Sequence, residues 1–147
     1  MTEAELDALL KTLVESLKRN SVNVVFSSNQ VNPDGNVFVC EALSAAADTG
    51  IIFFGGFENR KKAALAEHHI AIVRKEIVCK DAVEAYRLAA SKSGFIFASS
   101  SASKTADIEG RLIWGMHGPR KFTVVLDCGI REAGGGSEGE RHLQSPE

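Results

Sequence analysis

Residues able to do chemistry gather in one stretch of this 147-residue chain, residues 99–127, between two apolar runs with the character of strands. The stretch begins with a serine-rich run followed by Lys104, and the composition of residues 104–109 predicts that a helix starts there. A helix N-terminus exposes backbone N–H groups and a partial positive charge, so this pattern predicts a cradle for a phosphate or carboxylate. Simple capping of a short helix by Ser103 or Thr105 explains the same residues equally well.

Two carboxylates and one histidine in this stretch are candidates for proton transfer. Asp107 and Glu109 are two positions apart, so on a helix they would diverge and could not share a proton. His117 lies in a Gly-Met-His-Gly-Pro turn, where glycines let the backbone approach a ligand and an imidazole titrates near neutrality. A histidine in a loop is more often a structural hydrogen-bond partner, so both roles stay open for His117.

The histidine and cysteine positions do not predict a metal site. His68 and His69 are adjacent at the expected start of a strand, where their side chains point to opposite faces and cannot easily bind one ion. Cys40, Cys79 and Cys128 are far apart and form no CxxC pair, so they predict neither zinc ligands nor an iron–sulfur cluster. For Cys40 and Cys79, which lie in or beside apolar runs, we expect reduced thiols in the core.

Length and charge limit the classes of protein to which the chain can belong. A chain of 147 residues fits one domain with a core of its own. The formal net charge of -2 provides no basic field for nucleic acid or anionic lipid, so neither is expected as a partner. The N-terminal residues lack the pattern of a signal peptide, and no apolar run is long enough to span a bilayer, so we expect a cytoplasmic protein.

The hydrophobic pattern predicts the elements that must position these residues. An amphipathic helix begins after Thr2 and ends at Asn20. Residues 41–47 are ambiguous between helix and strand, and residues 129–147 are glycine-rich and charged, which predicts a flexible tail after a single domain of residues 1–128. Strands are predicted at 22–26, 36–40, 51–54, 68–73, 94–98 and 122–126, and further helices at 58–67 and 82–91.

The order of these elements predicts an α/β fold with a layered mixed sheet flanked by helices. The turn at residues 32–35 contains proline and glycine, so the strands on its two sides, 22–26 and 36–40, could form a hairpin.

Three spaced motifs resemble the LUD-domain family, which is named for lactate utilisation. The first comprises residues 103–109 with the Gly-Met-His-Gly-Pro turn and residues 124–127. The second, residues 47–54, resembles the acidic-Thr-Gly-Thr segment of the family, and the third, residues 65–73, resembles its Leu-Pro-x-x-His-Ile-x-Val-Val segment. The resemblance covers about residues 40–128, and three motifs in order make it fairly specific.

This resemblance implies a fold of the NagB/RpiA/CoA-transferase-like group and a role in a system that oxidises L-lactate to pyruvate with iron–sulfur components. The chain has no cluster ligands, so it resembles the LutC-like subunit, with no cofactor of its own and with iron–sulfur subunits as partners. Relatives are generally longer, which implies a short form with an abbreviated N-terminal half. Ile51 and Ala66 stand where the family motifs have threonine and proline.

We therefore expect one site for a small anionic metabolite, with His117 or Glu109 as the acid or base. Two alternatives stay open: an enzyme of the same fold group that uses Glu109 or Glu41 as a nucleophile or base on an anionic substrate, and a non-catalytic assembly subunit. The residues expected to bind the ligand are Asp48, Thr49, Gly50, Ser103, Lys104, Thr105, Asp107, Gly118 and Arg120.

Overall fold

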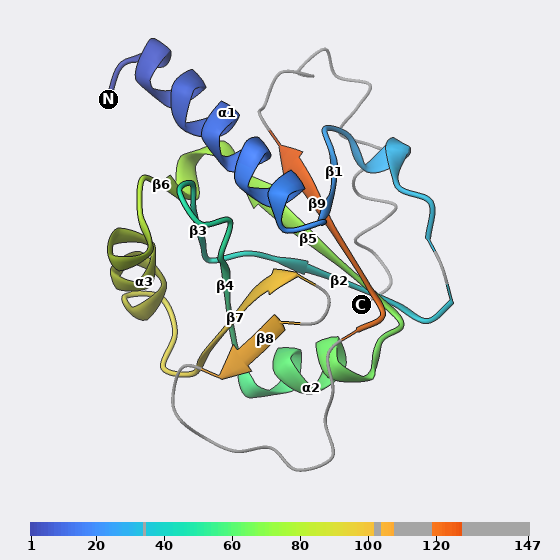
Figure 1. Cartoon of the computed structure of the whole chain (residues 1–147). Helices are drawn as coiled ribbons and strands as arrows, with labels where there is room; N and C mark the ends of the chain where they lie inside the picture. Colours follow the sequence, from blue (N-terminus) through green and yellow to red (C-terminus); the bar gives the residue numbers. More distant parts are fainter. Residues whose placement is uncertain (34, 102–103, 108–118, 128–147) are drawn as a thin grey trace.

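The computed structural model describes residues 1–33, 35–101 and 119–127, and the backbone of residues 104–107 (Figure 1). These residues confirm the predicted α/β class, with strands that divide between two sheets. The described residues contain three helices, α1 (Glu3–Arg19), α2 (Phe57–Leu65) and α3 (Ala82–Ala90), and two short 3-10 turns at Ser28–Gln30 and Lys75–Ile77.

The first sheet, sheet A, is entirely parallel, and the second, sheet B, is mixed. Sheet A has the order β1 (Asn23–Val25), β9 (Lys121–Asp127), β5 (His68–Arg74), β2 (Val37–Glu41). Sheet B has the order β6 (Val78–Cys79), β3 (Ser44–Ala46), β4 (Ile52–Gly55), β7 (Ile96–Ser101), β8 (Lys104–Asp107), and within it the β3–β6 pair alone is parallel.

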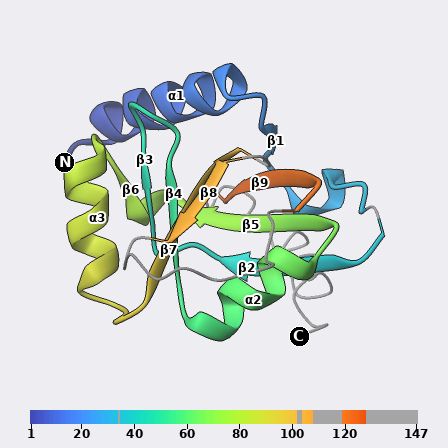
Figure 2. The same ribbon diagram turned by 60° about the horizontal axis from the view of Figure 1, so that its bottom comes forward.

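The strands of the two sheets run in clearly different directions, and helices close the ends of the structure (Figure 2). In both views α1 and α2 lie on opposite sides, while α3 flanks sheet B. Apolar side chains from α1, from both sheets and from α2 form one continuous core, which includes Leu13, Phe54, Ala63 and Phe97. The two sheets and their helices therefore fold as one unit.

Helix α1 begins and ends where the sequence predicts. The Thr2 side chain accepts a hydrogen bond from the Glu5 backbone, and the Glu5 side chain accepts one from the Thr2 backbone, which forms a capping box. Leu13 and Leu17 are fully buried on the face that meets the core. Asn20 caps the C-terminus of the helix, as its position after the last apolar residue indicates.

The C-terminal part of α1 holds the turn that joins β3 to β4. The buried Ser16 hydroxyl donates to the Ala47 carbonyl at 2.7 Å and lies 3.1 Å from the Asp48 carbonyl. The Asn20 side-chain amide donates to the Thr49 carbonyl at 2.9 Å. Backbone acceptors of the turn thus find their donors on a helix that is about thirty residues away in sequence.

Gly50 lets this turn come close to α1. Its φ is +78°, in the left-handed region that favours glycine. A Cβ at this position would lie 2.7 Å from the Asn20 side-chain nitrogen and 3.3 Å from the backbone carbonyl carbon of Ser16. The glycine of the predicted ligand-binding motif is therefore required by the fold itself.

Two local predictions are wrong. Strands 22–26 and 36–40 do not form a hairpin, because β1 pairs with β9 and β2 pairs with β5, both in parallel. Parallel pairing on the long buried strands β5 and β9 hides more apolar surface than a two-stranded hairpin would.

The segment that was predicted to start a helix at Lys104 is instead strand β8, which pairs antiparallel with β7. The register sets Ala98 opposite Ala106, and the β7–β8 ladder satisfies backbone groups that a helix would have satisfied internally. An anion cradle built on a helix N-terminus at this point is consequently excluded. The ambiguous segment 41–47 contains the end of β2 and all of β3, and the predicted tail 129–147 lies outside the described residues.

The contact between α1 and the β3–β4 turn predicts a specific loss of stability. Ser16→Ala removes the donor to the turn carbonyls in a buried place, so we expect the free energy of unfolding to fall by about 1–2 kcal/mol. Thr12→Ala is the matched control, since its exposed hydroxyl bonds only within α1, and its effect should stay within about 0.5 kcal/mol. Urea unfolding followed by circular dichroism measures both, and equal effects would contradict the assigned role.

Candidate functional site

The structure describes part of the predicted site. Ser103, Glu109, His117 and Gly118 lie outside the described residues, so their predicted roles remain predictions. The other predicted residues lie in two places. One set lies near the start of β4 and of β8, and the other lies at the end of β8 and the start of β9. Lys104, Thr105 and Asp107 are placed by the backbone of β8.

One group lies where β4 begins and where β7 meets β8. The register aligns Ile52 with Ser99, and Ser99 with Thr105, on three neighbouring strands. Because Gly50 comes two residues before Ile52, the β3–β4 turn and the start of β8 lie at the same end of sheet B. The fold thus brings two predicted ligand-binding segments, 48–50 and 104–105, to one edge.

Within this edge the turn is largely occupied with structure. Its carbonyls accept hydrogen bonds from α1, and the Thr49 hydroxyl accepts one from the Ile51 backbone at 3.3 Å. The side chains of Asp48 and Thr49 are exposed.

The remaining two residues lie where β8 ends and where β9 begins, in different sheets. Asp107 is aligned with Phe97 of β7, and Arg120 immediately precedes β9. The Arg120 side chain is exposed and lies 4.0 Å from the Glu67 carboxylate, which also accepts a hydrogen bond from the Asn36 backbone. Arg120 is therefore placed at the amino end of sheet A, away from the hydrogen bonds that hold the β3–β4 turn.

Near the strands that carry Asp107 and Phe122, the core contains a buried arginine and a buried histidine that our sequence analysis did not assign to a site. Arg60 of α2 is 6% exposed, and its guanidinium carbon lies 5.8 Å from the centre of the Phe97 ring. His69 of β5 is 1% exposed. Phe97 is aligned with Asp107, and His69 is aligned with Phe122 at the start of β9. Asp107 is thus aligned with the ring that Arg60 contacts, and Phe122 is aligned with His69 itself.

The imidazole of His69 lies in an aromatic cage. Its ring centre is 5.6 Å from that of Phe38, 4.9 Å from that of Phe54 and 5.3 Å from that of Phe122. Neither ring nitrogen has a hydrogen-bond partner within the part of the chain that is described. Burial is the main cause that lowers the pKa of His69 from 6.5 to about 3, and the charges of His68 and Arg60 contribute to the same shift. His69 is therefore neutral at physiological pH.

The neighbouring histidine illustrates the ordinary structural role. His68 points to the opposite face of sheet A, as predicted for adjacent residues of a strand, and its Nε2 lies 2.8 Å from the Thr123 hydroxyl. The Asn23 amide reaches the same hydroxyl at 3.4 Å. His68 is thus part of a hydrogen-bond network that links β1, β9 and β5.

The sequence contained a signal for His69 but none for Arg60. His69 matches the histidine of the Leu-Pro-x-x-His-Ile motif, although we considered it only as a metal ligand. Arg60 gave no signal, because a lone arginine in a helix with a weak apolar stripe normally faces solvent. Its burial follows from the packing of α2 over sheet B.

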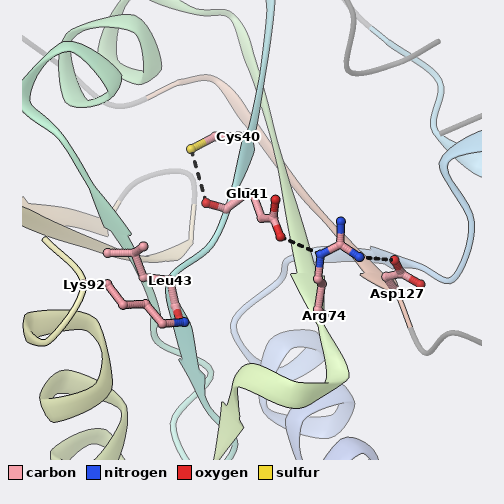
Figure 3. Close-up of polar contacts among 6 residues, drawn as sticks. All are labelled: Cys40, Glu41, Leu43, Arg74, Lys92 and Asp127. Carbon is pink, nitrogen blue, oxygen red and sulfur yellow. Dashed lines mark hydrogen bonds and ion pairs between the residues drawn. The ribbon is translucent and has the colours of Figure 1, made fainter. Parts of the chain in front are cut away.

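A second cluster of charged residues lies at the carboxyl ends of three strands of sheet A (Figure 3). The Arg74 guanidinium lies between the carboxylates of Glu41 and Asp127, at 2.5 Å and 3.3 Å. Asp127 is largely covered, whereas Arg74 and Glu41 are about half exposed. Open α/β sheets often bind ligands at this edge, but here two carboxylates surround one cation. The cluster ties β2, β5 and β9 together and does not favour an anion.

The two described cysteines are buried free thiols, as predicted. Burial and the nearby Glu41 carboxylate raise the pKa of Cys40 to about 12, and burial raises the pKa of Cys79. The described part of the chain contains no group of three or more histidine, cysteine, aspartate or glutamate residues arranged to hold a metal ion. It also contains no helix with the length and hydrophobicity that crossing a membrane requires.

Comparison with known proteins gives a family and a fold. The LUD domain family model matches residues 33–126, which is more than half of the chain. Among solved structures, a DUF162 family protein from Deinococcus radiodurans is similar, with a TM-score of 0.56 and 14% sequence identity over 86% of this chain and 99% of that one. At this identity the likeness shows the fold alone. No curated protein matches the chain.

The neutral state of His69 predicts how stability depends on pH. Below about pH 6.5 the unfolded chain binds a proton at this position, whereas the folded chain binds none until about pH 3. Stability should therefore fall with decreasing pH in this window, by about 1.4 kcal/mol per pH unit from this group alone. His69→Leu should remove that share of the slope.

Urea unfolding between pH 5 and pH 8 provides the measurement. Phe38→Leu is the control, since Phe38 packs on the same imidazole and does not titrate. This control should lower stability equally at every pH, so its curve should run parallel to that of the wild type. A His69→Leu curve that also runs parallel would show that His69 is not held neutral by the fold.

Proposed function

The chain belongs to the LUD domain family, which is named for lactate utilisation, and from this premise we propose that it binds a small anionic metabolite in an iron–sulfur lactate-oxidising system. Its part would be that of the LutC-like, cluster-free component, acting in the cytoplasm. The clusters would belong to partner subunits.

The observation that carries this proposal is the course of β8 and β9. Asp107 at the end of β8 and Phe122 at the start of β9 both lie beside the buried Arg60 and His69, through their alignment with Phe97 and His69. Segments with the family motifs therefore end or begin next to strands that carry or contact buried polar side chains, which supports a site for a small polar ligand in this part of the fold. An exposed loop with no buried polar neighbour would not support the same proposal.

In this proposal the start of β8 supplies the positive charge at the solvent side. Lys104 would attract the anion, and the hydroxyl groups of Ser103 and Thr105 would donate hydrogen bonds to it. His117 or Glu109 would accept or donate the proton if the bound molecule reacts. Asp48 and Thr49, at the same end of sheet B, would line the rim, whereas Arg120, which precedes β9 and lies near Glu67, would be outside this site.

Calorimetric titration of the purified chain with L-lactate, pyruvate, sugar phosphates and CoA thioesters tests the proposal. We expect saturable binding of at least one small carboxylate. Lys104→Ala should weaken that binding about tenfold or more, the scale of one charge-assisted hydrogen bond. Lys11→Ala, an exposed lysine on α1, is the matched control and should leave binding unchanged.

Absence of heat and of any thermal shift with every compound would contradict the ligand-binding role. If the chain in that case co-purified with an iron–sulfur subunit, the assembly role would replace it. Binding that is lost equally in Lys104→Ala and Lys11→Ala would place the site elsewhere.

A second candidate function, acyl or CoA transfer, is favoured by the position of Glu41. This carboxylate lies at the carboxyl end of a parallel strand, about half exposed, and it is held by Arg74 (Figure 3). An oriented, accessible carboxylate is what a covalent mechanism of this class needs. The ion pair also argues against it, since it makes the carboxylate a weaker nucleophile.

Incubation with acetyl-CoA followed by hydroxylamine distinguishes the two functions. Transfer chemistry would leave a hydroxamate on Glu41, detectable by mass spectrometry and absent in Glu41→Gln. Glu76→Gln, an exposed carboxylate on the turn after β5, should behave like the wild type. Because the proposed binding role has no covalent step at Glu41, we expect no adduct in the wild type or in Glu76→Gln.

A further inference from the structure

Strand β2 is an outer strand of sheet A, and no described strand pairs with its second edge. Its neighbour β5 lies on one side, and the order of the sheet ends at β2. The edge of a sheet presents a row of backbone N–H and C=O groups that can pair with another chain, and natural proteins usually protect it. An edge strand without such protection therefore indicates an interaction surface.

The backbone of β2 shows which of its residues face outward. The Asn36 carbonyl accepts a hydrogen bond from the first residue of β5, and the Ala42 N–H donates to another residue of the same strand. Because backbone groups alternate between the two sides of a strand, every second residue between these two positions also faces β5. The backbone groups that point away from β5 are those of Val37, Val39 and Glu41.

The other edge strands of the two sheets carry protection that β2 lacks. In the part of the chain that is described, β1 has three residues and β6 has two, and very short edge strands seldom recruit a partner. Strand β8 begins with Lys104, and an edge lysine discourages pairing. Strand β2 has five residues, with neither lysine nor proline, and its valines and phenylalanine favour strand formation. Among these four strands, β2 is the best suited to accept another strand.

Apolar side chains lie beside this edge. Val37 and Val39 are only partly buried, and Leu65 at the end of α2 is 69% exposed. Leu65 lies near the start of β2, because α2 lies beside β2 (Figure 2) and the Glu67 backbone donates to the Asn36 carbonyl. An apolar edge with an exposed leucine next to it fits a partner that is itself an apolar strand.

We infer that β2 pairs antiparallel with β2 of a second copy of this chain, so that sheet A continues across a twofold axis. Full overlap of the five residues sets Val39 opposite its own copy, and Val37 opposite Glu41 of the second copy. The two Val39 residues then exchange N–H···O=C bonds at the axis, since their backbone groups point outward. This surface does not include the residues of the proposed ligand site, so the inference goes beyond that function and does not rest on it.

The charges at this edge favour a second copy in this register. Glu41 is the charged residue of β2, and two carboxylates directly opposite each other would repel. In the full overlap the two Glu41 positions are displaced by about 13 Å along the strands, which exceeds the Debye length of about 8 Å at physiological ionic strength. Each Glu41 also keeps Arg74 of its own chain as a partner. The register that pairs the whole strand thus also keeps the like charges apart.

Sedimentation velocity over a range of protein concentrations tests this inference. We expect a monomer–dimer equilibrium with a dissociation constant of about 1–100 µM, because an edge of five residues is smaller than a standard interface. Val39→Pro removes the N–H at the axis but no bond to β5, and it should weaken dimerisation about tenfold or more. Val39→Lys should act in the same direction, since it sets like charges opposite each other. Val25→Lys, at a partly buried valine on the opposite edge of sheet A, is the matched control and should dimerise like the wild type.

Hydrogen exchange of the wild type, followed by NMR, covers the case in which a variant does not fold. The amides of Val37, Val39 and Glu41 should gain protection as the concentration rises through the dissociation constant, whereas those of Phe38 and Cys40 should be protected throughout by β5. Three results would overturn the inference: a wild type that stays monomeric well above this range, a dimer that Val39→Pro leaves as stable as Val25→Lys does, or a Val39 amide that is already protected in the monomer.

Discussion

Strand β5 is paired along both of its edges, and most of the structure depends on this constraint. It is aligned with β2 over five residues and with β9 over seven, so its backbone groups are satisfied from both sides. Every residue from His68 to Val73 is buried as a result. A central parallel strand must be covered on both faces, which requires sheet B and the helices on one side. It also forces two adjacent histidines into the interior, on opposite faces.

The rest of the chain is attached to this strand by a few polar contacts that span long sequence separations. Ser16 and Asn20 join α1 to the turn that starts β4, and Arg74 joins the ends of three strands of sheet A. The contacts from α1 satisfy backbone carbonyls, and the contacts of Arg74 pair opposite charges where strands end. The half-exposed ion pairs contribute little stability individually, so their main effect is to fix the relative position of the strand ends.

The sequence predicted those features whose cause is local. The helix from Glu3 to Arg19 follows from its capping residues and its apolar spacing, and β5 follows from a run of β-branched residues. Pairing partners were missed, since β1 and β9 are separated by about a hundred residues and no local rule links them. Lys104 was assigned to a helix although the sequence of residues 104–107 is equally compatible with a strand. Pairing with the edge of β7 decides between the two structures, and no local rule predicts that pairing. Arg60 was missed because its burial depends on packing between α2 and β7.

The charge distribution differs between the Arg74 cluster and the surroundings of His69. At the carboxyl edge of sheet A an incoming anion would meet Arg74 together with two carboxylates, whose combined charge repels it. Near His69 the charged group is the guanidinium of Arg60, and burial keeps the imidazole itself neutral. Ligand sites usually lie at the carboxyl edge of a parallel sheet, yet here that edge is closed by its own ion pairs. The carboxyl edge of sheet A therefore has a structural role.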